Sequence, residues 1–145
     1  MNKNWFLFIL LLISYGVTAQ KWENTYKIAL EKSKKEDKPI ILVFSGSDWC
    51  APCIKLDKDI WQSDAFKKEA AAKYILYRAD FPRKKGNQLS EELQSSNKKL
   101  AEKFNGQGYF PLVVILDKNE KVLGTTAYKR LSPTQYIDHL NSFIH

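Results

Sequence analysis

The stretch from Pro39 to Leu56 constrains the fold of this chain more than any other part. It opens with the apolar, largely β-branched run Ile40 to Phe44, which is typical of a strand buried on both faces of a sheet. The turn-forming residues Ser45 to Asp48 interrupt this run. Cys50-Ala51-Pro52-Cys53 follows, and apolar residues at helical spacing begin directly after it. The sequence therefore predicts two cysteines at the point where a buried strand passes into a helix.

The start of a helix favours reactive cysteine chemistry. The first turn has N–H groups without partners and the positive end of the helix dipole, and both stabilise an anion. A thiolate at Cys50 would be better populated at neutral pH in that field. Cys53 lies one helical turn later, where it could attack a mixed disulfide formed at Cys50 and release a reduced product. Pro52 fits the first turn because its missing N–H would have no partner there.

Three other interpretations of the cysteine pair are open. A structural disulfide across two residues closes a small loop and removes little entropy from the unfolded chain. A zinc site needs four ligands, but the chain has two cysteines and two histidines, His139 and His145, which lie far along the sequence. A pair of inert core cysteines fits poorly beside Asp48 and Pro52. The motif in its context favours a redox-active pair.

The segment Trp49-Cys50-Ala51-Pro52-Cys53 after a buried strand resembles the active site of thioredoxin-like proteins, and the residues from Phe44 to Cys50 are similar to secreted bacterial members. The resemblance covers nearly all of the chain after residue 19. It implies an α/β thioredoxin fold, with a central mixed β-sheet flanked by helices on both faces. It also implies a thiol–disulfide oxidoreductase that uses Cys50 and Cys53 as its catalytic, redox-active pair and has no cofactor.

The same resemblance indicates which residues bind the substrate. Trp49 is expected to be a partly exposed aromatic platform beside Cys50, and the alternative is a simple core tryptophan. Pro111 resembles the proline that adopts a cis peptide bond and faces the cysteine pair in this family. Pro52 and Phe110 are expected to contribute to the same surface. Phe110 is bulkier than the residue usual at its position, so the resemblance predicts a groove whose shape departs from that of the family.

Met1 to Ala19 has the pattern of a signal peptide. Lys3 supplies a basic start, Trp5 to Ile13 an apolar run, and Val17-Thr18-Ala19 the small residues that signal peptidase requires. The apolar run is short for a membrane span, and an uncleaved membrane anchor is the alternative. We therefore expect residues 1–19 to be removed and residues 20–145 to form one thioredoxin-like domain in the periplasm or cell envelope.

The net charge of +7 comes from basic residues scattered along the chain, including the pairs Lys34-Lys35, Lys84-Lys85 and Lys98-Lys99. The sequence has no glycine-rich phosphate loop and no recognisable nucleic-acid module, so we expect no nucleic-acid partner. We interpret the basic residues as a solvated surface. A preference for acidic substrates or for anionic membrane surfaces stays open.

Hydrophobic periodicity and turn residues predict the other elements of the fold. We expect helices over Trp22 to Lys38, from Cys53 to about Gln62, over Ala65 to Lys73, from Ser90 to Phe104 and from Ser132 onward, and strands over Tyr74 to Asp80, Leu112 to Leu116 and Lys121 to Thr126. The last helix is expected to bury Ile137, Leu140, Phe143 and Ile144. Asp48 is interpreted as a helix cap and His139 as a surface histidine.

One position departs from the thioredoxin pattern. Thioredoxins commonly carry a buried aspartate six residues before the first cysteine, and this chain has Phe44 there. A carboxylate at that position accepts the proton of the resolving cysteine. With Phe44 in its place, we expect a more stable core and a resolving step at Cys53 that speeds up as the pH rises.

The leading hypothesis is an exported enzyme that reduces protein disulfides and draws electrons from a membrane donor, because the periplasm is oxidising. No histidine lies between the cysteines to stabilise a thiolate, which favours a thioredoxin-like potential. One alternative is a disulfide isomerase. Another is a binding or chaperone module that uses the groove around Trp49 and Pro111 without turnover. Copper handling by the thiols is a third, weakened because Met1 is the only methionine.

Overall fold

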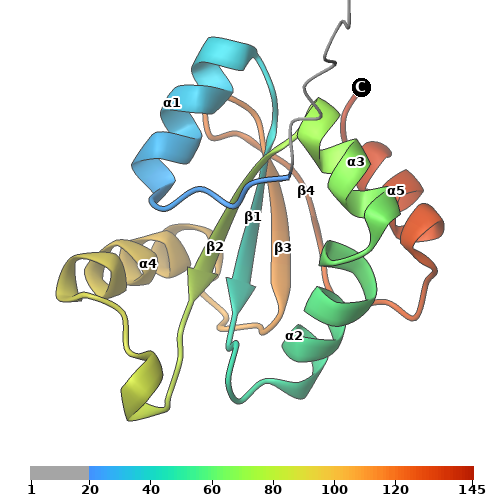
Figure 1. The fold of residues 1–145 in the computed structure, drawn as a ribbon. Helices are drawn as coiled ribbons and strands as arrows, with labels where there is room; N and C mark the ends of the chain where they lie inside the picture. The colour runs from blue at the N-terminus through green and yellow to red at the C-terminus, as the bar shows by residue number, and fades with distance from the viewer. Residues whose placement is uncertain (1–19) are drawn as a thin grey trace, which may run out of the picture.

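The computed structural model describes residues 20–145, and the predicted signal peptide, Met1 to Ala19, lies outside the described residues (Figure 1). In chain order the elements are α1 (Tyr26–Glu36), β1 (Ile40–Ser45), α2 (Ala51–Leu56), the π-helical segment η1 (Asp57–Trp61), α3 (Asp64–Lys73), β2 (Ile75–Asp80), the 3₁₀ turn η2 (Lys85–Asn87), α4 (Glu91–Phe104), β3 (Leu112–Leu116), β4 (Val122–Thr126) and α5 (Pro133–Asn141). Strands and helices alternate through most of the chain, as the α/β prediction requires.

The four strands form one mixed sheet in the order β2-β1-β3-β4. β1 runs parallel to β2 and antiparallel to β3, and β3 and β4 form an antiparallel pair. Every residue of β1 is buried, in agreement with its continuous apolar sequence. The carboxyl end of β1 lies between the carboxyl end of β2 and the amino end of β3, so the cysteine motif that follows β1 emerges at the middle of one end of the sheet.

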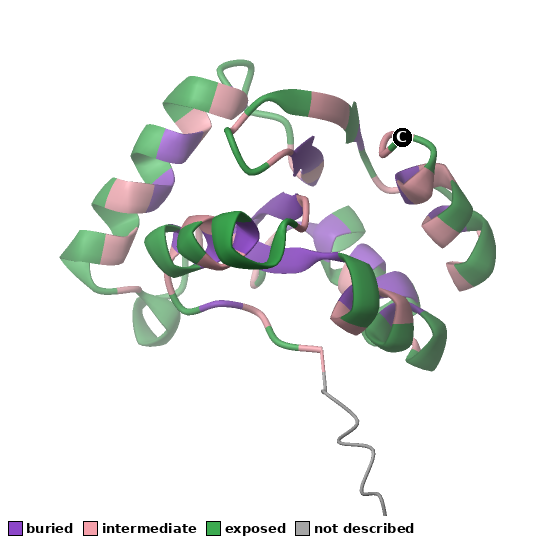
Figure 2. Cartoon of the chain, turned by 90° about the horizontal axis from the view of Figure 1, so that it is seen from above, coloured by how far each residue is buried: buried purple, intermediate pink, exposed green. Residues whose placement is uncertain are grey.

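Helices cover both faces of the sheet (Figure 1). Along β1, Ile41 and Val43 point to a core shared with α2, η1, α3 and α5, whereas Leu42 and Phe44 point to a second core shared with α1 and α4. The view from above in Figure 2 shows the buried strands enclosed between these two helical layers. The predicted fold class, a central mixed sheet with helices on both faces, is confirmed.

Side-chain caps define where several helices begin. Ser63 caps α3 and Ser90 caps α4, each by accepting a backbone N–H from the first turn. Ser132 and Gln135 form a capping box at the start of α5, the helix predicted from Ser132, with Pro133 in the first turn. These starts agree with the sequence predictions because capping depends on residues only three positions apart.

The predicted helix over Trp22 to Lys38 is wrong at its beginning. α1 starts only at Tyr26, after the cap Thr25. Trp22 instead forms an isolated parallel bridge with Leu76 and lies under the guanidinium of Arg78, 4.5 Å from the ring centre. Contacts with β2 therefore override the helical spacing of Trp22. Trp22 gains a backbone pairing with the edge strand of the sheet, and its indole is covered by neighbouring side chains.

Two further details differ from the predictions. The helix after the cysteines is α-helical only to Leu56 and continues as the π-helical turn η1, a distinction that the spacing of apolar residues does not encode. In α5 the fully buried side chains are Tyr136 and Leu140, whereas the other three predicted residues are only partly buried. Tyr136 is buried because its hydroxyl donates to the carbonyl of Ala127, at 3.0 Å.

Candidate active site

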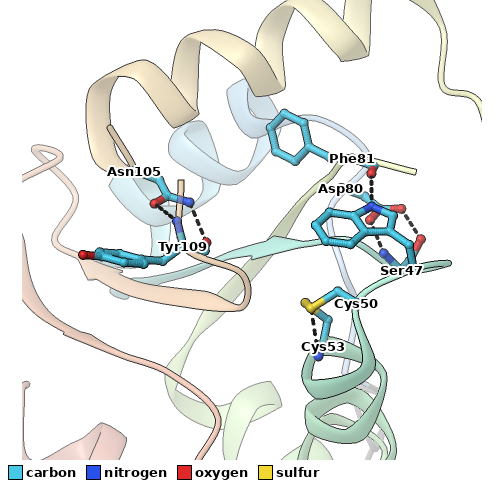
Figure 3. Close-up of a disulfide and its surroundings, with 8 residues drawn as sticks. Ser47, Cys50, Cys53, Asp80, Phe81, Asn105 and Tyr109 are labelled. Carbon is cyan, nitrogen blue, oxygen red and sulfur yellow. Dashed lines mark hydrogen bonds between the residues drawn. A yellow bond between two sulfur atoms is a disulfide. The ribbon is translucent and has the colours of Figure 1, made fainter. Parts of the chain in front are cut away.

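The two cysteines lie at the start of α2, joined by a disulfide (Figure 3). Cys50 is the N-cap of α2, and its Sγ accepts the backbone N–H of Cys53 at 3.3 Å. In this oxidised form Cys50 is 5% exposed and Cys53 is 3% exposed. The two residues therefore differ little in exposure, and the hydrogen bond to the Cys50 sulfur is the clearer difference.

The turn between β1 and α2 is fixed by hydrogen bonds at both ends. The carbonyl of Gly46 accepts the backbone N–H groups of Trp49, at 3.2 Å, and of Cys50, at 2.9 Å. The N–H of Ser47 donates to the Asp80 carboxylate at 2.9 Å, and the Ser47 hydroxyl donates to its second oxygen (Figure 3). Asp80 ends the neighbouring strand, so the sheet itself holds the turn that carries Cys50.

Trp49 is half-buried beside the cysteines. Its Nε1 donates to the carbonyl of Phe81 at 2.7 Å, and its ring packs edge-on against Phe110 at 5.5 Å between centroids. The guanidinium of Arg83 lies over the same ring, 3.7 Å from its centre. Gly46 makes this position possible, because a Cβ on Gly46 would lie 2.3 Å from the Trp49 ring.

The peptide bond between Phe110 and Pro111 is cis, as the resemblance predicted. The approach to this bond is held by Asn105, a buried residue that the sequence did not single out. Its amide nitrogen donates to the carbonyl of Tyr109 at 2.8 Å, and its amide oxygen accepts the Tyr109 N–H at 2.9 Å (Figure 3). Phe110 is wedged between aromatic rings, since it also packs against Phe81 at 5.5 Å.

A groove of about 580 Å³ runs beside the cysteine motif. The structure brings together Pro52, Phe110 and Pro111 along one wall. The other wall was not predicted and consists of the end of β4 and the residues after it, Thr125 to Lys129, together with His139. A second hollow, of about 700 Å³, is lined by residues before α1 and by residues of α1, α3 and the start of β2; none of them belongs to the cysteine motif, whereas Pro52 of the motif lines the first groove. Open, largely apolar grooves of the first kind suit an extended peptide segment.

His139 is not the surface histidine that we predicted. The residue is half-buried, and its Nε2 lies 2.8 Å from the hydroxyl of Thr126. The imidazole also packs edge-on against Phe143, at 5.1 Å between ring centroids. Burial, and secondarily the charge of Lys129, lower the pKa of His139, so the imidazole is neutral at neutral pH. Its place in the groove wall depends on the packing of α5 against β4, which no local pattern reveals.

Asp48 is not a helix cap, because Cys50 occupies that position. The Asp48 carboxylate accepts the backbone N–H groups of Arg83 and Lys84, both at 2.9 Å, and the side-chain amide of Asn87 at 3.0 Å. Led by the hydrogen bond from Arg83, these interactions lower the pKa of Asp48. Asp48 therefore fastens the segment after β2 to the turn before the cysteines.

Within residues 20–145 no group of three or more His, Cys, Asp or Glu side chains is placed so that it could hold a metal ion. None of the helices described is both long and apolar enough to cross a membrane.

Comparison with known proteins agrees with the geometry of the site. Residues 21–118 match the family model described as thioredoxin-like. The chain is 37% identical over 122 residues to the disulfide bond reductase DsbH of Chlamydia pneumoniae, covering 84% of this chain and 71% of that protein. It is 31% identical over 100 residues to the thioredoxin-related protein DsbJ of the same organism, covering 69% of this chain and only 28% of the relative.

Solved structures agree as well. A DsbH oxidoreductase superposes with a TM-score of 0.81 and 31% identity, over 99% of this chain and 94% of that one. A disulphide isomerase from Xylella fastidiosa Temecula1 shares the fold, with a TM-score of 0.63 and 21% identity over 91% of this chain and all of that one. These matches, the sheet topology and the Cys50–Cys53 pair show that the chain belongs to the thioredoxin-like family, as a thiol–disulfide oxidoreductase.

Proposed function

We propose that this protein reduces protein disulfides in the bacterial cell envelope, with Cys50 as the attacking thiolate and Cys53 as the resolving one. The observation that carries the assignment is the hydrogen bond from the Cys53 N–H to the Cys50 sulfur. A hydrogen bond to the charged form of a group lowers its pKa. Among residues 20–145 we find no comparable donor to the Cys53 sulfur, so Cys50 ionises first.

The reaction begins from the dithiol form. The Cys50 thiolate attacks one sulfur of the substrate disulfide, which breaks that bond and releases a substrate thiolate that takes a proton from water. The Cys53 thiol then loses its proton and attacks the Cys50 sulfur. The mixed disulfide breaks, the second substrate thiol leaves, and the protein holds the Cys50–Cys53 disulfide seen in the structure. Two electrons have passed from the protein to the substrate.

The direction of transfer follows from how weakly the thiolate is stabilised. Only Ala51 and Pro52 separate the cysteines, so a backbone N–H, with no neighbouring cationic side chain in the motif, stabilises the anion. Strong oxidants such as DsbA depend on a far more stable thiolate and reach about −120 mV, whereas thioredoxin lies near about −270 mV. A potential near the lower value makes this protein a reductant. The relative DsbH of Chlamydia pneumoniae is named a disulfide bond reductase, which supports the same direction.

Export completes the proposal. The basic, apolar and small-residue pattern of residues 1–19 supports cleavage before Gln20 and a location in the periplasm or cell envelope. Structural disulfides persist in such compartments because these are oxidising. A reductant there has to be reduced again after each turnover, so we propose a membrane protein as its electron donor. Intact mass of envelope protein beginning at Gln20 is the expected result, and a chain beginning at Met1 would contradict it.

The substrate segment lies in the groove beside the motif. Pro52, Phe110 and Pro111 form an apolar wall next to the disulfide, and Trp49 extends it through its contact with Phe110. An extended chain placed there would bring its own cysteine sulfur to Cys50. The groove does not itself need the cysteines, so it also favours the second candidate, a binding or chaperone module without turnover.

Trapping separates these two functions. Cys53→Ser, mixed in its reduced form with a disulfide-bonded protein, should accumulate a mixed disulfide at Cys50, located by mass spectrometry of the digested adduct. The matched variant Cys50→Ser should trap nothing under the same conditions. Trapping at Cys53 in the second variant would reverse the roles. Substrate binding that persists in the double serine variant, without disulfide reduction by the wild type, would favour the binding module.

A further inference from the structure

Three cations beside the active site have no role in the chemistry above. Arg83, Lys84 and Lys85 belong to the segment from Pro82 to Gln88, here called the basic loop, and all three are exposed. Within residues 20–145 six ion pairs form, and none of them includes these three side chains. Their charges are therefore available to a partner.

The basic loop is held in a fixed position relative to Cys50. The carboxylate of Asp48, two residues before Cys50, accepts the backbone N–H groups of Arg83 and Lys84 at 2.9 Å. Inside the loop, the Gln88 side-chain amide donates to the carbonyls of Pro82, at 3.0 Å, and Lys84, at 3.2 Å. Asp48 thus binds the backbone of the loop and not its cationic side chains. The loop backbone is held in place while these side chains stay in solvent.

One of these cations also contacts the substrate-binding surface. The guanidinium of Arg83 stacks 3.7 Å from the centre of the Trp49 ring. The same ring packs against Phe110, which lines the groove. A peptide that leaves the groove past Trp49 would therefore meet Arg83 first and the lysines of the loop next. Lys129, which is exposed and lines the groove, adds a further positive charge to the groove.

We infer that the basic loop binds acidic side chains that flank the disulfide of a protein substrate. The inference rests on the proposed reductase function, and it identifies the substrate class. Arginine pairs with carboxylates through two parallel hydrogen bonds, and a stacked guanidinium keeps its N–H edges free for them. Exposed charges beside a binding groove also accelerate the encounter with a partner of opposite charge. An acidic peptide fits better than an anionic membrane, because the loop is aligned with a groove that already receives the substrate chain.

The test uses three synthetic peptides with the same cyclic disulfide, flanked by Glu, Gln or Lys residues. We expect the mature wild-type protein, at low ionic strength, to reduce the Glu peptide with a kcat/KM about tenfold above that of the Lys peptide. The ratio should fall toward one in the triple variant Arg83→Gln/Lys84→Gln/Lys85→Gln. Added salt should lower the wild-type ratio in the same way, a measurement that requires no variant to fold.

A matched control has the same net charge. Lys34, Lys35 and Lys121 are exposed and lie at the other end of the sheet, because α1 and the β3–β4 turn meet where Ile40 pairs with Leu116. Lys34→Gln/Lys35→Gln/Lys121→Gln should keep the tenfold preference. An equal loss of preference in the control variant would assign the effect to net charge and overturn the inference.

The remaining outcomes separate the two proposals. Equal reduction of all three peptides by the wild type would overturn the role of the basic loop and leave the reductase function intact. Failure to reduce any of them would overturn the reductase function itself. Co-sedimentation with phosphatidylglycerol vesicles that depends on the loop, together with a peptide preference that does not, would assign the loop to a membrane surface and contradict the inference.

Discussion

Gly46→Ala tests how closely the active-site turn is packed. A Cβ at this position would lie 2.3 Å from Cε2 and 2.6 Å from Nε1 of Trp49, whereas ordinary contacts begin near 3.4 Å, so the indole would have to shift by about 1 Å. That shift breaks the hydrogen bond from Nε1 to the Phe81 carbonyl, now 2.7 Å long. It also moves the ring against Phe110 and Arg83.

The cost can be bounded from these contacts. Loss of one hydrogen bond contributes about 0.5–1.5 kcal/mol. Overpacking a closely packed site contributes about 1–3 kcal/mol. We therefore expect Gly46→Ala to lower the free energy of unfolding by about 1.5–4.5 kcal/mol. No left-handed backbone angle adds to this figure, since Gly108 is the glycine with a positive φ in the described chain.

The assay is a double-mutant cycle measured by urea unfolding of the oxidised protein, followed by far-ultraviolet circular dichroism. Gly46→Ala is introduced into the wild type and into Trp49→Ala, where the indole is gone and the new methyl group has space. We expect the full cost in the wild type and less than about 0.5 kcal/mol in the Trp49→Ala background. An equal cost in both backgrounds would show that the penalty comes from the backbone and not from the contact with the tryptophan.

Three further predictions concern other positions. Gly124→Ala places a Cβ 2.1 Å from the Phe143 ring and should cost about 1–3 kcal/mol by urea unfolding, with a smaller cost in a Phe143→Ala background; equal costs would contradict the packing. The folded-state pKa of Asp48 is lowered, so its carboxylate stabilises the fold at neutral pH, and this contribution is lost as the pH falls through that pKa. The stability difference between the wild type and Asp48→Asn should therefore shrink between pH 7 and about pH 2, and a constant difference would argue against the role of the charge. Phe44→Asp removes a fully buried ring, worth about 1.5–3 kcal/mol, and should melt lower but resolve mixed disulfides faster near neutrality. Stopped-flow reduction from pH 6 to 9 checks this, and an unchanged pH–rate profile would leave Phe44 as core packing alone.

The parts of the fold that the sequence predicts well depend on neighbouring residues. The strand from Ile40 is recognisable because its apolar run is continuous, and the cap at Ser132 because its partner is three residues away. The cysteine motif belongs to the same class, since it adjoins both a strand and a helix start. Phe44 was expected to be buried, and it is fully so.

The parts that the sequence does not reveal depend on partners far along the chain. Asp48 binds residues 35 to 39 positions later, and Trp22 pairs with a strand more than fifty positions away. His139 reaches the groove only because α5 packs beside β4, where Thr126 ends that strand. The basic loop was interpreted as solvated surface for the same reason, because its attachment to Asp48 and its stacking on Trp49 arise only in the folded protein.

The equilibrium reduction potential of the Cys50–Cys53 pair decides whether the protein reduces or forms disulfides. The protein is equilibrated with mixtures of reduced and oxidised glutathione, the thiols are trapped by alkylation, and the two forms are counted by mass. A reductase whose thiolate is stabilised by a backbone N–H should have a potential near the thioredoxin value of about −270 mV. A potential near about −120 mV, the value of the strong oxidant DsbA, would show that the protein donates disulfides and would contradict the proposed direction.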